Sequence, residues 1–396
     1  MKVAFIGNMN NNHFSLTRFL RTRGVDATLL LTDREYPHFH PSADCLGDSY
    51  THFTRQLTWG SPTSLQRVSK KRMFADLAEF DILIGCGLAP ACCAHAGRSL
   101  DVFVPYGSDI WESTMFRLCR PKNIITSWRA AIAQRSAIAK LPIIHMPPAR
   151  VYEDRLARLA PRSARWREGL PMVYSPMYQG NQTQRLLRET PHGDRFQKIR
   201  QTCDLMVFSA VRHAWCLPDS DPNSKGTDRL LRAIASVAAR RPNLRIRLVT
   251  MEYGQDVVAS KALAIELGIA DSIEWLPLMH RRELMGGLLI SDVACAEFVT
   301  SYDSSGVVYE ALVAGKPLIM HRVDSQYAPS APPGGLCPVL NAHTPIEIAD
   351  RLQWVADHPQ DSRAFGARGT LWYDSEVVDR ALRKYIGLCA RDGASI

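Results

Sequence analysis

The chain has 396 residues, a length that predicts two to three domains at roughly 150 residues each. Apolar residues make up 46% and charged residues 22%, which excludes a largely disordered, collagen-like or coiled-coil protein. The net charge of +9 favours an anionic partner. No apolar run reaches the ~18 residues that span a bilayer. The run VAFI near the N-terminus is too short for a signal peptide, so we expect a cytoplasmic protein.

The first half of the chain alternates strand-like and helix-like segments. Apolar runs expected as strands are 3–6, 25–32, 80–87 and 100–107. Residues 14–23 have the spacing of an amphipathic helix, whereas residues 37–65 show no clear period and are expected to be mainly loop. Strands that alternate with helices predict right-handed crossovers and a parallel sheet.

The second half repeats this alternation after a polar stretch, residues 180–202, which we interpret as a linker. Strands are expected near 205–211, 244–251, 273–277, 292–296 and 316–320, and a helix over 227–240. We therefore predict an α/β protein with two doubly wound, Rossmann-like domains, over residues 1–190 and 204–365. In open sheets of this kind, ligands bind beyond the carboxyl ends of the strands, and we expect the two domains to face a central cleft.

The first candidate site is the loop that follows the first strand. Asn10, Asn11, Asn12 and His13 lie where a helix N-terminus presents unpaired N–H groups. Gly7 is the loop's only glycine, so a dinucleotide fingerprint is absent. The amides could bind sugar hydroxyls, or the asparagines could simply form a left-handed turn and cap the helix.

Two further candidate sites lie in the second half. Arg212 follows a predicted strand and Lys225 precedes a helix, so both should lie at one edge of the sheet and could hold a diphosphate. The loop Ser304, Ser305, Gly306 and Val307 can offer N–H groups to phosphate at the next helix N-terminus. Glu310 could accept hydrogen bonds from a ribose diol, or simply favour the first helical turn.

These segments together resemble the nucleotide-sugar-binding domain of GT-B glycosyltransferases of family 4. The resemblance rests on Arg212, Lys225-Gly226, the segment SDVACAEF and the segment GVVYEALVAGKPLI, in the family's order. It implies that Arg212 and Lys225 hold the donor diphosphate during catalysis. It also implies that Glu310 binds the donor ribose, and that residues 304–307 approach the donor phosphates.

The sequence departs from the family at three places. The family has two glutamates separated by seven residues, and the first position is Tyr302 here; Asp303 beside it, or Glu297, could substitute. Tyr106 or Asp109 occupies the place of a family histidine; Asp109 would then be catalytic, although an ordinary turn and helix cap also fits. The N-terminal loop, with Tyr106, is expected on the acceptor side. The segment 372–390 resembles the final helix that packs back on the first domain.

The resemblance implies a retaining glycosyltransferase that moves a sugar from a nucleotide diphosphate donor to an acceptor hydroxyl, in the synthesis of cell-surface glycans or glycolipids. No metal and no cofactor are expected, because cations and helix N-termini can neutralise the leaving diphosphate. A nucleotide-sugar 2-epimerase on the same fold is the alternative. Nucleic-acid binding and a Rossmann oxidoreductase are disfavoured, since neither the recognition motifs nor the glycine fingerprint is present.

The positive charge is concentrated in one region of the first half. Residues 115–170 contain 12 Lys/Arg and 3 Asp/Glu, a net +9 that leaves the remainder of the chain neutral. Arg117, Arg120, Lys122, Arg129 and Arg135 alternate there with large apolar residues. This mixture predicts an interfacial helix, either for an anionic membrane surface or beside a glycan or lipid-linked acceptor; a solvated basic helix pair is the plainer interpretation.

Overall fold

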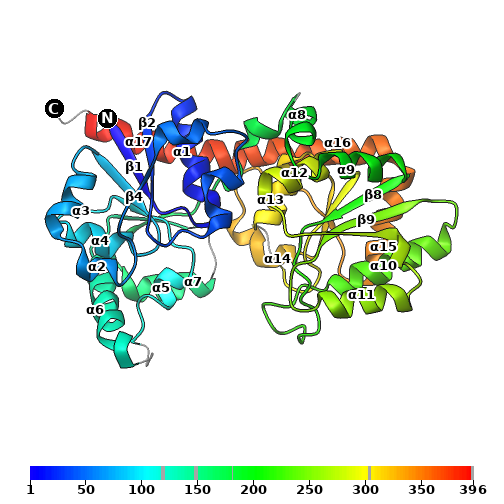
Figure 1. The fold of residues 1–396 in the computed structure, drawn as a ribbon, viewed down its shortest axis with the longest axis horizontal. Helices are drawn as coiled ribbons and strands as arrows, with labels where there is room; N and C mark the ends of the chain where they lie inside the picture. The colour runs from blue at the N-terminus through cyan, green and yellow to red at the C-terminus, as the bar shows by residue number, and fades with distance from the viewer. Residues whose placement is uncertain (117–120, 147–149, 181, 302–304, 394–396) are drawn as a thin grey trace. The chain divides into compact units, whose positions relative to one another are not determined.

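The computed structural model describes residues 1–116, 121–146, 150–180, 182–301 and 305–393. The chain forms two compact units. Unit 1 contains Met1–Tyr174 and Val377–Ile396, and unit 2 contains Ser175–Glu376. Each unit is a parallel sheet with helices on both faces (Figure 1). The predicted α/β class with two Rossmann-like, doubly wound domains is confirmed.

Unit 1 contains a seven-stranded parallel sheet with the order β3-β2-β1-β4-β5-β6-β7. Its strands are β1 (Lys2–Ile6), β2 (Asp26–Leu31), β3 (Thr54–Gln56), β4 (Ile82–Gly85), β5 (Val102–Phe103), β6 (Ile143–His145) and β7 (Ala164–Trp166). The interior strand β1 is apolar without alternation, and Val3–Ile6 are fully buried. Continuous apolar runs are typical of strands that helices cover on both faces.

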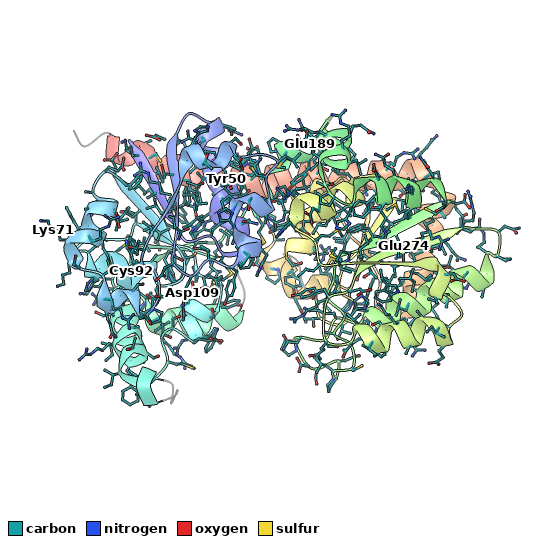
Figure 2. All side chains as sticks on the ribbon, in the orientation of Figure 1. Tyr50, Lys71, Cys92, Asp109, Glu189 and Glu274 are labelled. Atoms are coloured by element: carbon teal, nitrogen blue, oxygen red, sulfur yellow. The ribbon has the colours of Figure 1, made fainter. Side chains whose placement is uncertain are left out.

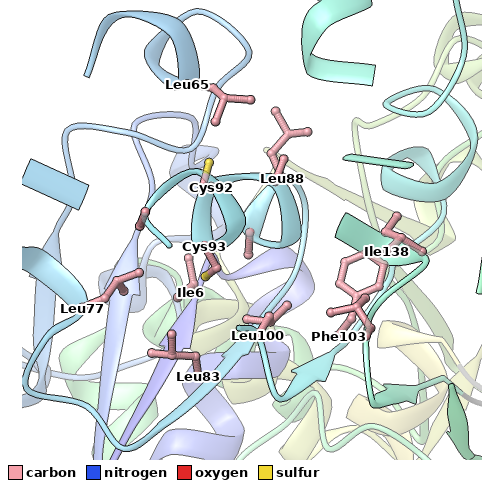
Figure 3. Packing of buried hydrophobic residues seen from close by; sticks show 14 of the residues in the cluster. Ile6, Leu65, Leu77, Leu83, Leu88, Cys92, Cys93, Leu100, Phe103 and Ile138 are labelled. Atoms are coloured by element: carbon pink, nitrogen blue, oxygen red, sulfur yellow. The ribbon is translucent and has the colours of Figure 1, made fainter. Parts of the chain in front are cut away.

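The helices of unit 1 follow the strands in the expected crossovers. They are α1 (Asn12–Thr22), α2 (Ser64–Arg67), α3 (Lys70–Leu77), α4 (Ala89–His95), α5 (Ser108–Trp111), α6 (Pro121–Ile138), α7 (Arg150–Leu159) and α17 (Arg380–Gly393). Figure 3 shows how side chains of β4, α4 and α6 interdigitate in the core, with Leu83, Cys92 and Ile138 among them. The C-terminal helix α17 packs on α1, which puts the end of the chain in unit 1 (Figure 1).

Unit 2 contains a six-stranded parallel sheet with the order β10-β9-β8-β11-β12-β13. Its strands are β8 (Leu205–Ser209), β9 (Ile246–Met251), β10 (Ile273–Leu276), β11 (Val293–Cys295), β12 (Leu318–Met320) and β13 (Leu340–Asn341). Its helices are α8 (Gln182–Glu189), α9 (Gly193–Gln201), α10 (Thr227–Arg240), α11 (Val257–Glu266), α12 (Arg281–Ile290), α13 (Gly306–Val313), α14 (Asp324–Tyr327), α15 (Pro345–Asp357) and α16 (Pro359–Trp372). Helix α10 has the bounds that its apolar spacing predicts.

The interpretation of residues 180–202 as a linker is wrong. These residues form α8 and α9, whose buried Leu186, Leu187 and Phe196 pack against α12. Gly287 of α12 gives the Phe196 ring its space, since a Cβ there would lie 2.5 Å from that ring. Both helices therefore belong to unit 2, which begins at Ser175, whereas we expected a first domain over 1–190 and a second over 204–365.

Two regions of unit 1 differ from a simple strand-helix alternation. Residues 37–53 form three short 3-10 helices, and the three-residue strand β3 follows them at the edge of the sheet. The described residues of the basic region 115–170 form α6, α7, strand β6 and the edge strand β7. Among the described residues, no helix combines the length and the apolarity that a membrane crossing requires.

Candidate functional site

The sheet of unit 2 reverses its strand order between β8 and β11, which are hydrogen-bonded neighbours. Ligands of doubly wound sheets bind beyond the carboxyl ends of the strands at such a switch point. The loops that leave this edge are residues 210–226 after β8 and, among the described residues, 296–301 and 305 after β11. Arg212, Lys225, Ser305 and the first residues of α13 therefore all lie on or beside these two loops.

Lys225 is buried at this edge and forms an ion pair. Its Nζ lies 2.9 Å from Oε1 of Glu297, and the two side chains are 9% and 14% exposed. Burial raises the pKa of Glu297, while the charges of Lys225 and Arg212 lower it. Glu297, which sequence analysis offered as a substitute for the family's first glutamate, thus lies in the field of both predicted phosphate-binding cations.

The backbone holds the two loops together around Lys225. The Phe298 N–H donates to the Lys225 carbonyl at 3.0 Å, and the Lys225 N–H donates to the Ala214 carbonyl at 2.6 Å. Gly226 adopts a left-handed conformation, with φ +65°, before α10. A Cβ on Gly226 would lie 2.8 Å from the Val299 side chain, so glycine is required for this close approach.

Arg212 is less buried than Lys225 and is oriented by the same loop. Its Nη2 donates to Oδ1 of Asn223 at 2.9 Å. The following residue, His213, holds this loop in place. Its ring is hydrogen-bonded to Ser260 Oγ at 2.9 Å and to Thr250 Oγ1 at 3.0 Å. Burial lowers the pKa of His213 to about 4, so the imidazole is neutral and serves as a structural element near pH 7.

The N-terminus of α13 lies next to this edge. Ser305 is its N-cap, and the Ser305 hydroxyl accepts a bond from the Val308 N–H at 3.4 Å. The N–H groups of Gly306 and Val307 begin the helix, where no intrahelical acceptor exists for them. The other two predicted donor-site residues, Asp303 and Ser304, lie outside the described residues.

Glu310 has a partner that sequence analysis missed. Arg281, the first residue of α12, donates from Nε to Glu310 Oε1 at 2.7 Å, and the two side chains are 11% and 9% exposed. A Cβ on Gly306 would lie 3.9 Å from Arg281 Nη2 and 3.9 Å from Glu310 Oε1. Arg281 therefore adds a third cation, next to the α13 N-terminus. A carboxylate accepts up to about four hydrogen bonds, so this ion pair is compatible with a ribose contact.

In unit 1, the asparagine-rich loop is a turn and a helix cap. Asn10 and Asn11 both adopt left-handed conformations, with φ 55° and 60°. The Asn8 side chain accepts from the Phe14 N–H at 2.9 Å and donates to Asn11 Oδ1 at 3.0 Å. Left-handed turns and side-chain caps are the local roles in which asparagine is favoured. Asn10 and Asn11 thus form the left-handed turn that we weighed for this loop, whereas the bond to the helix N–H comes from Asn8. An acceptor-side role of Asn10 and Asn11 stays a prediction.

Asn12 and His13 are buried on α1. The His13 Nδ1 bonds the Gly7 carbonyl at 2.7 Å, and burial lowers its pKa to about 4. Neither Asn12 nor His13 lines the cavity of unit 1 that lies beyond the strand ends. Their acceptor-side role stays a prediction.

Asp109 is fully buried (Figure 2) and its carboxylate binds backbone N–H groups. It accepts from Gly87, Tyr106 and Gly107 at distances of 3.1 Å each. Burial raises its pKa to about 7, although these backbone bonds lower it. Asp109 therefore fixes the loops after β4 and β5. It is not the N-cap that we weighed as the alternative, because Gly107 is the N-cap of α5 and Asp109 lies in the first turn. A catalytic role stays a prediction.

A cavity of about 220 Å³ lies at the carboxyl edge of the unit 1 sheet. Tyr106 lines it, together with Asn8 and Glu35, which the sequence analysis did not single out. The acceptor-side role of Tyr106 stays a prediction. Glu35 Oε1 accepts from the Asn8 N–H at 3.1 Å and the Thr32 hydroxyl at 2.9 Å. Burial raises the pKa of Glu35. Its position soon after β2 is the one sequence signal that could have identified it. Among the residues described, no group of three or more His, Cys, Asp or Glu side chains is placed to hold a metal ion.

No family model matches the sequence. A curated relative, D-inositol 3-phosphate glycosyltransferase from Saccharomonospora viridis, is 33% identical over 155 residues, 37% of this chain. The chain spans about a third of that relative's length, since the match covers 35% of it.

Solved structures share the fold over nearly the whole chain. The Anabaena HepE complex with UDP and glucose has a TM-score of 0.60 at 13% identity, with 98% of this chain and 100% of that chain covered. Sucrose-phosphate synthase from Thermosynechococcus elongatus has a TM-score of 0.58 at 12% identity, and the match covers 99% of each chain. UDP-GlcNAc 2-epimerase from Neisseria meningitidis, bound to UDP-GlcNAc, has a TM-score of 0.56 at 12% identity. The match covers 97% of this chain and 100% of that chain.

Proposed function

We propose that this chain is a glycosyltransferase that moves a sugar from a nucleotide diphosphate donor to an acceptor hydroxyl. It has the GT-B fold, with two Rossmann-like units whose parallel sheets have seven and six strands. The main support is the set of three cations, Arg212, Lys225 and Arg281, at the carboxyl edge of the unit 2 sheet beside the N-terminus of α13. This combination suits a diphosphate.

In the proposed reaction, cations of the protein stabilise the departing diphosphate. As the glycosidic bond to phosphate breaks, negative charge grows on the diphosphate oxygens. Arg212 and Lys225 would stabilise that charge, and so would the N–H groups of Gly306 and Val307. No metal is then needed for this step. The proposal keeps Glu310 as the ribose ligand, positioned by Arg281.

The proposal assigns the acceptor to unit 1, at the cavity lined by Asn8, Glu35 and Tyr106. Carboxylate, amide and phenol groups are suited to sugar or polyol hydroxyls, because each can accept or donate hydrogen bonds. Retention of anomeric configuration, family 4 membership and a role in glycan or glycolipid synthesis belong to this proposal through the sequence resemblance. HepE was solved with UDP and glucose, so UDP-glucose is the first donor to test.

The test is a transfer assay. The protein is incubated with a panel of nucleotide sugars, each with and without inositol phosphates or lipid-linked sugars, and products are identified by mass spectrometry. We expect release of one nucleoside diphosphate that depends on acceptor, with the sugar recovered on the acceptor. Arg212→Gln should reduce kcat/KM by roughly 10- to 100-fold, the value of one charge-assisted bond of ~1.5–3 kcal/mol.

The matched control is Arg245→Gln. Arg245 is an exposed arginine that pairs with Asp204 just before the strands of the same sheet begin, so its loss should leave transfer unchanged. Conversion of the nucleotide sugar into an epimer, with no sugar on any acceptor, would reject transfer in favour of the epimerase alternative.

A further inference from the structure

Helix α6 of unit 1 is apolar on two opposite faces. Its inward face buries Ala130, Ala137 and Ile138 against the core of unit 1 and against α4. Its outward face exposes Ile125, Trp128 and Ile132, which are 65%, 39% and 56% exposed. The spacing of i, i+3 and i+7 aligns these three side chains along one stripe of the helix. Packing in the core of unit 1 explains why the inward face of α6 is apolar, but it does not explain the apolar outward face.

Two further exposed apolar residues precede α6 in the sequence. Met115 and Phe116 are 43% and 51% exposed. The Phe116 ring meets the Trp128 ring edge-on, with the two centroids 5.7 Å apart. Five large apolar side chains thus share this surface, which we call the α6 face and define by Met115, Phe116, Ile125, Trp128 and Ile132. Contiguous exposed apolar groups of this size mark interaction sites.

Cations border the α6 face on both sides. At 100° per residue, Arg129 falls on one flank of the stripe and Arg135 on the other. Lys140 follows two residues after α6 ends, and all three cations are exposed. The Arg135 guanidinium lies 5.8 Å from the Phe116 ring centroid. No Asp or Glu occurs between Ser113 and Tyr152, a stretch that holds seven Lys/Arg. The surface is therefore positive and apolar, with no acidic residue from this stretch.

We propose that the α6 face docks unit 1 onto an anionic phospholipid bilayer. Aromatic and aliphatic side chains would enter the boundary between headgroups and acyl chains, while Arg129, Arg135 and Lys140 meet lipid phosphates. A nucleic-acid partner would leave Ile125 and Ile132 without a role, and a protein partner would require acidic groups to match the cations. The proposal narrows the basic region 115–170 to this face, on which Ile125 is exposed and its neighbour Ile124 is only half-exposed. The docking does not depend on sugar transfer.

The test is vesicle flotation of the full chain, without nucleotide. We expect binding to vesicles of phosphatidylcholine mixed with phosphatidylglycerol, and little binding to phosphatidylcholine alone. Arg129→Gln with Arg135→Gln should lower the partition coefficient on anionic vesicles by about twenty-fold, since each cation near such a surface contributes about five-fold. Ile125→Ser with Ile132→Ser should lower it by on the order of ten-fold or more.

The matched control is Val258→Ser with Ile265→Ser. These residues have the same seven-residue spacing on α11 of unit 2 and are 82% and 70% exposed. This variant should bind anionic vesicles like the wild type. Because all four substituted apolar side chains are exposed, every variant should retain the wild-type circular dichroism and unfolding midpoint.

Three results would overturn the proposal. Equal binding to neutral and anionic vesicles would remove the role of the cations. Unchanged binding in the Ile125→Ser, Ile132→Ser variant would remove the role of the apolar stripe. A dimer in sedimentation velocity that the same variant dissociates would show that a second copy covers the face. Nucleoside diphosphate binding, measured separately, would stand or fail independently of each.

Discussion

Two glutamates of unit 2 each form an ion pair with a cation of the candidate site, and these pairs fix the positions of the cations. Glu297 is paired with Lys225 and Glu310 with Arg281, at 2.9 Å and 2.7 Å. Removing one partner from a buried pair leaves an uncompensated charge, which costs more than the pair itself contributes. We therefore expect the cations at this edge to be fixed in position before a donor arrives, which favours binding by preorganisation.

Sequence alone placed Arg212 and Lys225 correctly at one edge of the sheet, because both flank a βα loop whose strand and helix have clear apolar periods. It did not find Arg281. This residue lies 29 positions before Glu310, at the start of a different helix, and only the sheet order brings the two together. The asparagine loop was ambiguous for another reason. The same amides serve a left-handed turn or a ligand, and local sequence does not separate the two roles.

The buried carboxyl group of Asp109 leads to a prediction about how stability depends on pH. Its pKa is about 7 in the folded chain, against 3.8 as its ordinary value. Between about pH 4 and pH 7, the folded state binds a proton that the unfolded state has lost. This group therefore makes the free energy of unfolding fall as pH rises through that window. Asp109→Asn removes the titration, so the unfolding free energy of the variant minus that of the wild type should rise with pH.

The measurement is urea unfolding of both proteins from about pH 4.5 to pH 8. The difference between variant and wild type should rise by up to about 1.4 kcal/mol per pH unit below pH 7 and level off above it. Titration of the buried histidines occurs in both proteins and cancels in the difference. Parallel curves across the whole range would show that Asp109 titrates normally, and that its burial among backbone N–H groups does not shift its pKa.

At the scale of elements, the C-terminal helix α17 is bound to unit 1 by an aromatic cluster. Tyr385 is 1% exposed, and its hydroxyl lies 2.8 Å from Nδ1 of His145 at the end of β6. The Tyr385 ring also meets Trp166 edge-on. Burial lowers the pKa of His145 to about 4, so the imidazole is neutral and one tautomer suffices for both of its hydrogen bonds.

We predict that Tyr385→Phe destabilises the docking of α17. The change keeps the ring but leaves His145 Nδ1 buried without its partner, which should cost about 1–3 kcal/mol in the free energy of unfolding. Urea unfolding measures the loss, and faster hydrogen exchange along α17 should accompany it. Tyr253→Phe on the surface of unit 2, where Tyr253 is 43% exposed, is the control. Equal small effects of both changes would contradict the account.

The elements themselves were predictable where burial on both sides leaves a clear pattern. Strands β1, β2, β4, β8 and β9 are apolar runs, and α10 has a complete apolar stripe. Helices α8 and α9 were interpreted as linker because each contributes only two large apolar side chains to the interior among many charged ones. Their stability comes from packing on α12, a tertiary contact that the local sequence does not encode.

At the scale of the whole molecule, both units share one strand order. Each places its first strand third in the sheet. The strand order reverses between the first and fourth strands, β1 and β4 in one unit and β8 and β11 in the other. Alternating segments predicted this class, because right-handed crossovers leave few other arrangements for parallel strands. The proposed donor and acceptor sites lie at the two switch points: a cationic edge in unit 2, and a cavity with Asn8, Glu35 and Tyr106 in unit 1.

We propose that the cationic edge of unit 2 binds the diphosphate of a nucleotide sugar. The test is calorimetric titration of nucleoside diphosphates into the wild type, Lys225→Met and the control Lys261→Met, which changes an exposed lysine paired with Glu252. We predict that one nucleoside diphosphate binds the wild type and the control equally. Its Kd should rise by at least about ten-fold in Lys225→Met, the value of one charge-assisted bond. Folded wild-type protein that binds no nucleoside diphosphate, or equal affinity in Lys225→Met, would contradict the account.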